Sequence, residues 1–233
     1  MPQAETLQHV RREERERLNP SLGNPSWLIL RKRRQLFQKW IGGLPESDLR
    51  ILDVGGRIQP YRALLSRRRH RYLAIDVLCT PLVNVVARGE QLPLPSGCFD
   101  VVFCTQVLEY VSEPRILIAE VHRVLKSGGV LLLSAPTMFP RDSDPEYWRF
   151  LPAGLDRLLA AFSSVEIVPE GYSISGFLRT INVFLMAVPG KAVRALLRFT
   201  MIPALNITGM MLESLLATTN DQFTVNFSVL AKK

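Results

Sequence analysis

The hydrophobic positions of this chain first repeat at helical spacing. Over residues 26–41 the apolar side chains recur near one helical face, at Ile29, Leu36, Phe37, Trp40 and Ile41. The basic residues 31–34 and Lys39 fall largely on the other face. This pattern predicts an amphipathic helix that either covers one end of the domain or lies on a membrane surface. Residues 1–20 are polar and end at Asn19-Pro20, which predicts a peripheral helix stopped by the proline.

From residue 50 onward, short β-rich runs alternate with helical stretches. This alternation predicts an α/β fold with a parallel sheet and crossover helices. Five runs and two weaker ones are expected to be strands: 50–54, 71–76, 82–87, 100–105, 130–135, then 165–168 and 223–231. Between them, residues 114–125 have the apolar spacing of a helix, and Lys126-Ser127-Gly128-Gly129 indicates where it ends.

An apolar segment, residues 177–217, interrupts the strands. Five charged side chains divide it, namely Arg179, Lys191, Arg194, Arg198 and Glu213. Its longest uncharged stretch, 199–212, is shorter than the roughly 20 residues that span a bilayer. The segment is therefore predicted not to cross a membrane, but to pack over the sheet, to dimerise or to lie in a membrane interface. The predicted organisation is a helical extension over residues 1–45 and a domain over residues 46–233 that contains this insertion.

Length and composition fit one folded domain. The 233 residues suffice for an α/β domain with a small appendage, and 47% hydrophobic with 21% charged residues excludes wholesale disorder and collagen-like chains. The net charge of +8 comes from the first 80 residues. A charge run of this kind favours a solvated face first, contact with a membrane surface second and nucleic acid last.

The cysteines and the N-terminus point to a reducing compartment. Cys79, Cys98 and Cys104 are odd in number and lack CxxC spacing, so neither a disulfide framework nor a zinc site is expected. The first residues lack the apolar stretch of a signal peptide. The expected location is the cytoplasm, including the inner face of a membrane.

Candidate chemistry begins where the first predicted strand ends. Gly55 and Gly56 follow that strand, at the edge of a parallel sheet where ligands approach the backbone. Asp76 ends the second strand, 21 positions after Gly55. An acidic residue at this spacing accepts the two ribose hydroxyls of a bound nucleoside, although a carboxylate there can also cap a loop. Together these residues predict an adenosine-containing ligand.

Four segments in this order resemble class I S-adenosylmethionine-dependent methyltransferases of the type 11 branch. They are LDVGG, AIDV, GEQLPLPSGCFDVVFCTQVLEYVSEP and AEVHRVLKSGGVLLLSAP, within residues 50–136. DPEYWRFLPAGLDRLLAAF is similar to a segment in some members, and FTVNFSVLAKK resembles the family's closing strand. The resemblance implies a Rossmann-like doubly wound, mostly parallel seven-stranded sheet with an antiparallel last strand. It also implies S-adenosyl-L-methionine as cofactor and no metal.

The resemblance carries over to individual positions. It implies Asp53, Gly55 and Gly56 beside the methionine part of the donor, Asp76 at the ribose, Glu90, Gln91 and Leu92 along the adenine, and Thr105 and Gln106 by the sulfonium and the acceptor. Candidates for a catalytic base are Asp142, Asp144 and Tyr147, after the fifth predicted strand, although a plain surface loop is the favoured interpretation of each.

Three positions depart from the family's pattern. Where the family has Asp-x-Gly-x-Gly-x-Gly, Arg57 and Gln59 replace the second and third glycines. Arg57 has a Cβ where close backbone approach is normally needed. Arg88 replaces an aspartate that many relatives place by the adenine amino group, and Glu90 is expected to compensate.

The predicted function is methyl transfer to a small-molecule, glycan or lipid-linked acceptor. Two alternatives remain open at this stage. The first is a non-catalytic binding module of the same fold, suggested by the altered glycine pattern. The second is a nicotinamide dinucleotide enzyme, which expects Gly-x-Gly-x-x-Gly and does not find it in residues 55–60. Peripheral membrane contact and a homodimer are further expectations, and nucleic acid is not an expected partner.

Overall fold

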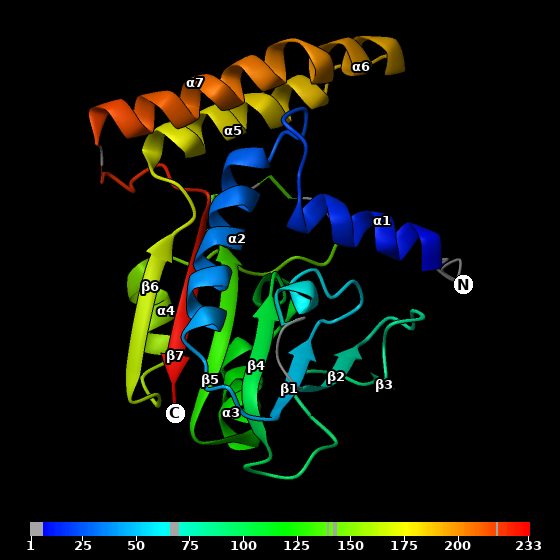
Figure 1. Ribbon diagram of the computed structural model, residues 1–233, viewed down its shortest axis with the longest axis vertical. Helices are drawn as coiled ribbons and strands as arrows, with labels where there is room; N and C mark the ends of the chain where they lie inside the picture. Colours follow the sequence, from blue (N-terminus) through cyan, green and yellow to red (C-terminus); the bar gives the residue numbers. More distant parts are fainter. Residues whose placement is uncertain (1–6, 66–69, 139, 142–143, 218) are drawn as a thin grey trace.

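Seven strands form one sheet in the computed structural model, which describes residues 7–65, 70–138, 140–141, 144–217 and 219–233 (Figure 1). The strands are β1 (Leu49–Val54), β2 (His70–Asp76), β3 (Val85–Val86), β4 (Phe99–Thr105), β5 (Leu125–Pro136), β6 (Ser164–Pro169) and β7 (Asn226–Lys232). Their order is β3-β2-β1-β4-β5-β7-β6. Only the pairs that involve β7 are antiparallel. The predicted fold class is confirmed.

Three predicted elements differ from the structure by more than one residue at an end. The run 82–87 contributes only Val85 and Val86 to the sheet, because the residues before them form a loop in which Asn84 accepts a hydrogen bond from the Ala74 amide (2.8 Å). The last strand begins at Asn226 rather than at residue 223. The helix predicted over residues 114–125 ends at Val124, and β5 begins directly after it. Residues 126–129, predicted to end the helix, therefore lie within the irregular start of β5.

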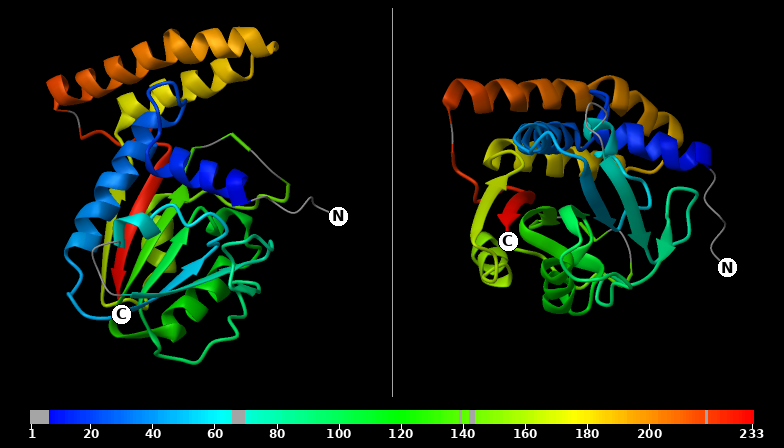
Figure 2. Two further views of the ribbon diagram at one scale, coloured as in Figure 1. Left: turned by 45° about the vertical axis from the view of Figure 1, so that its right-hand side comes forward. Right: turned by 60° about the horizontal axis from the view of Figure 1, so that its bottom comes forward.

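Helices cover both faces of the sheet (Figure 2). They are α1 (Leu7–Leu18), α2 (Trp27–Gly42), α3 (Pro114–Val124), α4 (Pro152–Leu158), α5 (Ser173–Met186), α6 (Lys191–Phe199) and α7 (Met201–Leu216), with the 3₁₀ helices η1 (Arg62–Leu65) and η2 (Leu108–Tyr110). Helices α3 and α4 bury their apolar sides in one core cluster with the strands. Helix α2 and η1 form the other cluster, on the opposite face. This two-layer burial holds the carboxyl ends of the parallel strands in fixed positions.

Helix α2 is the predicted amphipathic helix, and the five apolar residues predicted for its inner face are all buried. Phe37 lies at the centre, with ring contacts to Trp40, Tyr61 and Phe103. One expectation is wrong. Arg33 does not lie on the solvent face but is 4% exposed, because its Nε donates to both carboxylate oxygens of Glu170 at 2.8 Å. A buried charge of this kind needs its partner.

Helices α5, α6 and α7 lie together beyond the carboxyl edge of the central parallel strands (Figure 1). The stretch Lys191–Leu216 joins α6 and α7 and is long and apolar enough, by length and composition, to cross a membrane; only 17% of its most apolar part is buried. The prediction considered only the uncharged residues 199–212. In the structure the helical segment begins earlier, at Lys191, and includes the charged residues of α6. The proposed division into domains stays a prediction.

Candidate active site

A cavity of about 970 Å³ opens where β1, β2 and β4 end. Its wall comes from these strand ends, from α1, from the start of α2 and from α5. Five of the nine predicted donor positions lie on this wall: Gly55, Asp76, Glu90, Thr105 and Gln106. The structure thus brings together side chains from three strands, at the sheet edge where open α/β sheets bind ligands.

The turn after β1 needs its two glycines. The amides of Gly55 and Gly56 both donate to the carbonyl of Ile75, at 2.8 and 3.1 Å. Gly55 has a positive φ of 78°, and a Cβ there would overlap the Val107 side chain. A Cβ on Gly56 would approach Ala74 and Asp53 to 2.9 Å. Only glycine at both positions lets the turn pack against β2 and still face the cavity.

The two replaced glycines are accommodated differently. Gln59 takes the left-handed conformation that a glycine would favour, with φ at 48°. Its amide donates to the Leu82 carbonyl (2.6 Å) and its side-chain oxygen accepts from Arg62 (2.9 Å), so the strained residue is held from two sides. Arg57 lines the cavity and reaches α1, where its guanidinium lies 3.8 Å from the Glu13 carboxylate. The cavity remains open beside it.

Asp76 is the carboxylate that ends β2 on the cavity wall. It is 8% exposed, and its Oδ1 accepts a hydrogen bond from the Leu78 amide at 2.8 Å. Burial raises the pKa of Asp76, while backbone donors at Leu78 and the charge of Arg57 oppose that rise. A carboxylate fixed by backbone amides and facing a cavity can accept hydrogen bonds from a diol.

The predicted adenine side is only partly on the wall. Glu90 lies there and forms an ion pair with Arg88 at 2.8 Å. Gln91 is exposed and lies off the wall. Leu92 is buried off the wall, with its amide donating to Glu120 at 2.9 Å. Their predicted roles at the adenine stay untested predictions.

The end of β4 supplies an ordered polar group. Gln106 has a positive φ of 55°. Its side-chain amide donates to Ser134 Oγ and to Asn226 Oδ1, each at 3.0 Å. Asn226 begins β7 and also lines the cavity. Sequence reasoning missed it because its partners in this network are far away along the chain, and nothing around position 226 indicates that the side chain faces a cavity.

Asp53 stands behind the wall rather than on it. The Tyr72 hydroxyl donates to its Oδ2 at 2.6 Å, and the carboxyl is 4% exposed. Burial raises the pKa of Asp53 to about 7, although the Tyr72 hydrogen bond opposes the rise. Asp53 and Gly56 therefore support the turn from behind, whatever their relation to a bound donor.

The candidates for a base are spread out. Asp142 lies outside the described residues, Asp144 is exposed and off the wall, and Tyr147 lies on the wall while half exposed. Two carboxylates that the sequence did not single out, Glu109 and Glu146, also line the cavity. Glu109 is only 2% exposed, so its carboxylate belongs to the buried part of the wall. Its position just after β4 is the signal that could have found it.

Among the described residues, no group of three or more histidine, cysteine or acidic side chains is arranged to hold a metal ion. Residues 52–133 match a family described as "Methyltransferase domain". This part of the chain is therefore similar to methyltransferase domains. The malonyl-[acyl-carrier protein] O-methyltransferase of Serratia marcescens is 30% identical over 172 residues, 64% of each chain. The human thiol S-methyltransferase TMT1B is 44% identical over 68 residues, 29% of this chain and 26% of that one.

The methyltransferase domain also has solved structural neighbours. A SAM-dependent methyltransferase from Archaeoglobus fulgidus superposes with a TM-score of 0.57 and 16% identity, covering 94% of this chain and 97% of that one. At this identity the likeness shows the fold alone. The chain spans less than two thirds of the length of these curated relatives, so activity and acceptor are argued below as proposals.

The cavity fits S-adenosyl-L-methionine, the cofactor of this family. A partly buried carboxylate ends β2, a glycine turn ends β1, and a strained glutamine ends β4, all on one wall. About 970 Å³ exceeds what the donor alone needs and leaves space for an acceptor. The nicotinamide alternative is not favoured, because residues 52–133 match the methyltransferase family and the glycine pattern of a dinucleotide enzyme is missing.

Proposed function

We propose that this protein transfers a methyl group from S-adenosyl-L-methionine to an amphiphilic, lipid-linked acceptor at the cytoplasmic face of a membrane. The observation that supports the transfer is the single wall shared by Gly55, Asp76 and Gln106, which continues toward α5. The same cavity thus offers a donor end and an acceptor end. A non-catalytic binding module would share the fold but has no specific support beyond Arg57, whose side chain leaves the cavity open.

S-Adenosyl-L-methionine supplies an electrophilic methyl group for in-line displacement. The residues of the chain position the donor and the acceptor relative to each other. Asp76 would hold the ribose hydroxyls through a carboxylate that the Leu78 amide keeps in place. Gln106 is locked by Ser134 and Asn226, so that its backbone keeps one geometry at the end of β4. Helix α1 covers the cavity with Glu13, and the cover excludes water from the reacting atoms.

A hydroxyl or amine acceptor must lose a proton. Tyr147 and the buried Glu109 both lie on the wall, and the Tyr147 amide donates to the Glu109 carbonyl at 2.7 Å. The loop that carries Tyr147 is thereby fixed to the end of η2. We assign proton removal to this pair of positions, because both line the cavity and they supply a carboxylate and a phenol.

The acceptor class follows from the surroundings of the cavity. The relatives are described as acting on malonyl-[acyl-carrier protein] and on thiols, so the family covers acceptors that differ widely in polarity. Here α5 closes the acceptor end with Arg179, and the helices packed on α5 are apolar outward. A cationic side chain inside and an apolar surface outside suit an acceptor with a polar head and a lipid tail.

The test is incorporation of label from methyl-labelled S-adenosyl-L-methionine into a fractionated cell extract. We expect label in the organic-solvent fraction of membranes, and loss of that label in Asp76→Ala. The matched control is Asp156→Ala, because Asp156 is an exposed aspartate of α4 off the cavity wall. Label confined to water-soluble products would overturn the acceptor class. Equal incorporation by both variants and the wild type would overturn the site.

A further inference from the structure

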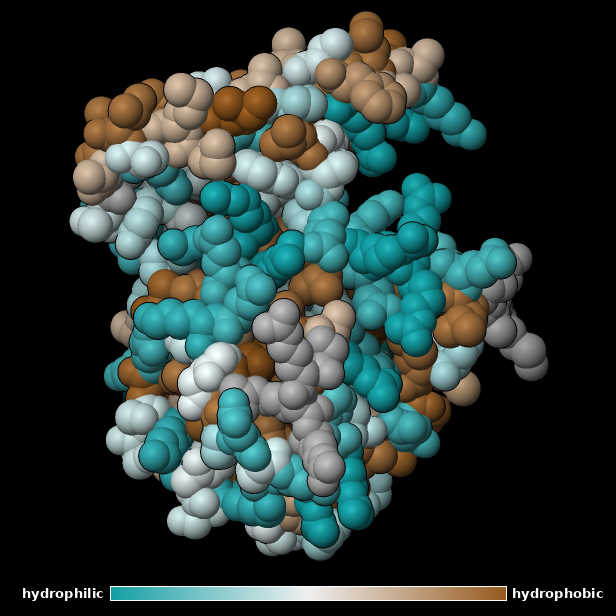
Figure 3. Space-filling model, viewed as in Figure 1, coloured by the Kyte–Doolittle hydropathy of each residue, from teal (hydrophilic) through white to brown (hydrophobic). Residues whose placement is uncertain are grey.

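The outer side of α6 and α7 is an apolar surface without a partner among the described residues. Figure 3 shows hydrophobic side chains along these helices, over the top of the molecule. Large apolar residues are exposed at helical spacing: Val193, Leu196 and Phe199 on α6, and Ile207, Met211 and Leu215 on α7. We call these six residues the outer apolar face. Phe199 is 84% exposed and Leu215 is 75% exposed. Single exposed apolar residues are ordinary, but a continuous exposed apolar surface marks a site of interaction.

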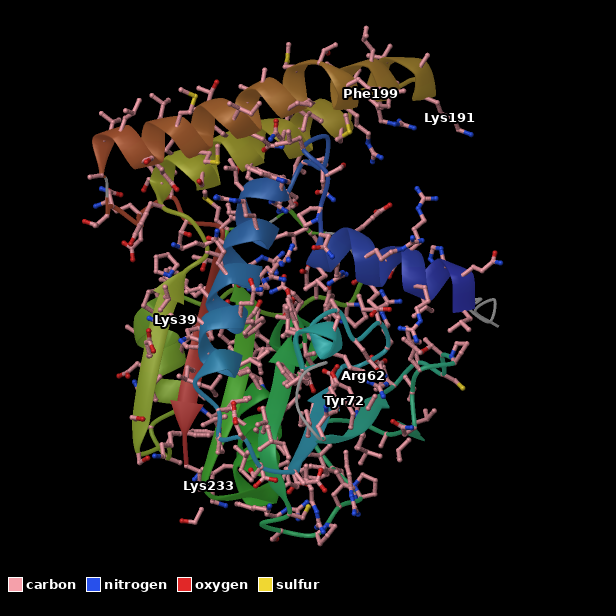
Figure 4. The ribbon with its side chains drawn as sticks, in the orientation of Figure 1. Lys39, Arg62, Tyr72, Lys191, Phe199 and Lys233 are labelled. Carbon is pink, nitrogen blue, oxygen red and sulfur yellow. The ribbon has the colours of Figure 1, made fainter. Side chains whose placement is uncertain are left out.

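The charges around the outer apolar face have one sign. Lys191, Arg194 and Arg198 occupy the other side of α6, which carries no acidic residue. Figure 4 shows Lys191 and Phe199 at the two ends of this helix. Basic and apolar residues divided between the two sides of one helix are typical of a helix that lies in the interface of an anionic bilayer.

The one acidic residue of α5, α6 and α7 is turned inward. Glu213 accepts hydrogen bonds from the amides of Tyr172 and Ser175, at 2.7 and 3.0 Å, at the start of α5. Its charge is therefore used to cap the neighbouring helix, and α7 presents no carboxylate on its outer side. An uncharged outer surface beside three cations is complementary to lipid tails beside anionic headgroups.

The inner side of α7 is held by polar contacts to the rest of the protein. Asn206 donates to the carbonyls of Leu22 and Asn24, at 2.7 and 3.1 Å, and accepts from Asn182 at 2.9 Å. Gly209 allows close packing, because a Cβ there would lie 2.9 Å from Leu28. If α7 crossed a bilayer, these buried polar groups would lose their partners in hydrocarbon. These contacts favour a position of α7 packed against the rest of the protein and not across a bilayer.

We propose that the outer apolar face is the surface that attaches this protein to an anionic lipid bilayer, with α6 and α7 lying in the plane of the membrane and not across it. The inference rests on the proposed function, to which it adds the attachment surface, its orientation and the charge of the lipid. Arg179 of α5 lines the cavity, and α5 packs against α7. Attachment through α6 and α7 thus places the acceptor end of the cavity near the bilayer that would supply the acceptor.

Flotation of the purified full-length protein with vesicles tests the proposal. We expect flotation with vesicles of phosphatidylcholine and phosphatidylglycerol, and much less with phosphatidylcholine alone. Leu196→Gln and Phe199→Gln are each expected to lower vesicle affinity about tenfold, because each removes a large apolar side chain from the bilayer. Lys191→Gln and Arg198→Gln are each expected to lower it about fivefold on anionic vesicles only.

The matched controls are Ile116→Gln and Arg115→Gln, exposed residues of α3 on the far side of the sheet, which should float like the wild type. Absence of flotation, or equal loss in α3 and α6 variants, would overturn the proposal. A dimer in light scattering that Phe199→Gln abolishes would assign the face to a second copy. In cells, resistance to alkaline carbonate extraction would contradict the in-plane orientation. Donor binding is measured on the same samples, so failure here leaves the methyltransferase proposal standing.

Discussion

Arg57 and Glu13 connect the turn after β1 to helix α1, with 3.8 Å between the guanidinium nitrogen and the carboxylate oxygen. Arg57 stands where the family's pattern has a glycine, and its side chain extends along the cavity wall toward α1. The substitution thus joins the donor end of the cavity to its cover. Because both side chains are about one third exposed, solvent screens the pair and its energy is small.

For Arg57→Ala we therefore expect a change in unfolding free energy below about 1 kcal/mol. Affinity for S-adenosyl-L-methionine should fall less than about fivefold, because the pair positions the cover and does not hold the donor. Urea unfolding and calorimetric titration measure the two effects. A loss of donor affinity as large as that of Asp76→Ala would make Arg57 a direct donor ligand and refute this interpretation.

Gln59 offers a comparison between conformational strain and hydrogen bonding. Gln59→Ala removes the bond to the Leu82 carbonyl and keeps a Cβ at a φ of 48°, so it should lower the unfolding free energy by about 1–3 kcal/mol. Gln59→Gly loses the same bond but relieves the left-handed strain. It should be more stable than the alanine variant by about 1 kcal/mol. The opposite order in urea unfolding would show that φ at this position carries no strain.

Asp53 should make stability depend on pH in an unusual direction. Burial raises its pKa to about 7 in the folded protein, against 3.8 for an ordinary aspartate. Between about pH 4 and pH 7 the folded state holds a proton that the unfolded state has lost, so stability from this group falls as pH rises and is level above pH 7. The fall is at most about 4 kcal/mol.

Asp53→Asn keeps the shape and removes the titration. The difference in unfolding free energy between wild type and Asp53→Asn should therefore change between pH 4 and pH 7, with the variant gaining relative stability toward the higher pH. Chemical unfolding at a series of pH values checks this. A constant difference across that range would mean that the folded-state pKa of Asp53 is not raised.

The buried pair of Arg33 and Glu170 should be strongly coupled. Glu170 also accepts a hydrogen bond from Ser228 at 2.5 Å, so its carboxylate is fully engaged. Arg33→Gln leaves that carboxylate buried without its cation and should cost about 3–5 kcal/mol. The double variant Arg33→Met, Glu170→Leu should lose clearly less, since no charge is left behind. Additive losses in thermal unfolding would contradict the coupling.

The sequence predicted the sheet well, because its period-two and helical runs are local signals. Gly55 and Asp76 could be placed at one edge by strand order alone, and the structure puts both on the cavity wall. Arg33 could not be predicted as buried, because its burial depends on Glu170, which is 137 positions away. Helical spacing predicts on which face of a helix a residue lies. It does not predict which distant residue will contact that face.

The acceptor side of the site was less accessible to sequence reasoning. Asn226 meets Gln106 only because β7 inserts between β5 and β6. Glu109 is buried because the loop with Tyr147 folds back over it, as the bond between the Tyr147 amide and the Glu109 carbonyl shows. Both contacts are long-range, so the sequence places Glu109 just after β4 and Asn226 near the last strand but does not show which partners they meet.

The most direct test of the central claim is calorimetric titration of the wild type and of Asp76→Ala with S-adenosyl-L-methionine. The wild type should bind one donor per chain, and the variant should bind it with an affinity lower by about 1–3 kcal/mol, as expected for a lost hydrogen-bonding carboxylate. Asp156→Ala, at an exposed aspartate of α4, serves as the control and should match the wild type. No measurable binding to the folded wild type, or equal affinity in Asp76→Ala, would contradict the account.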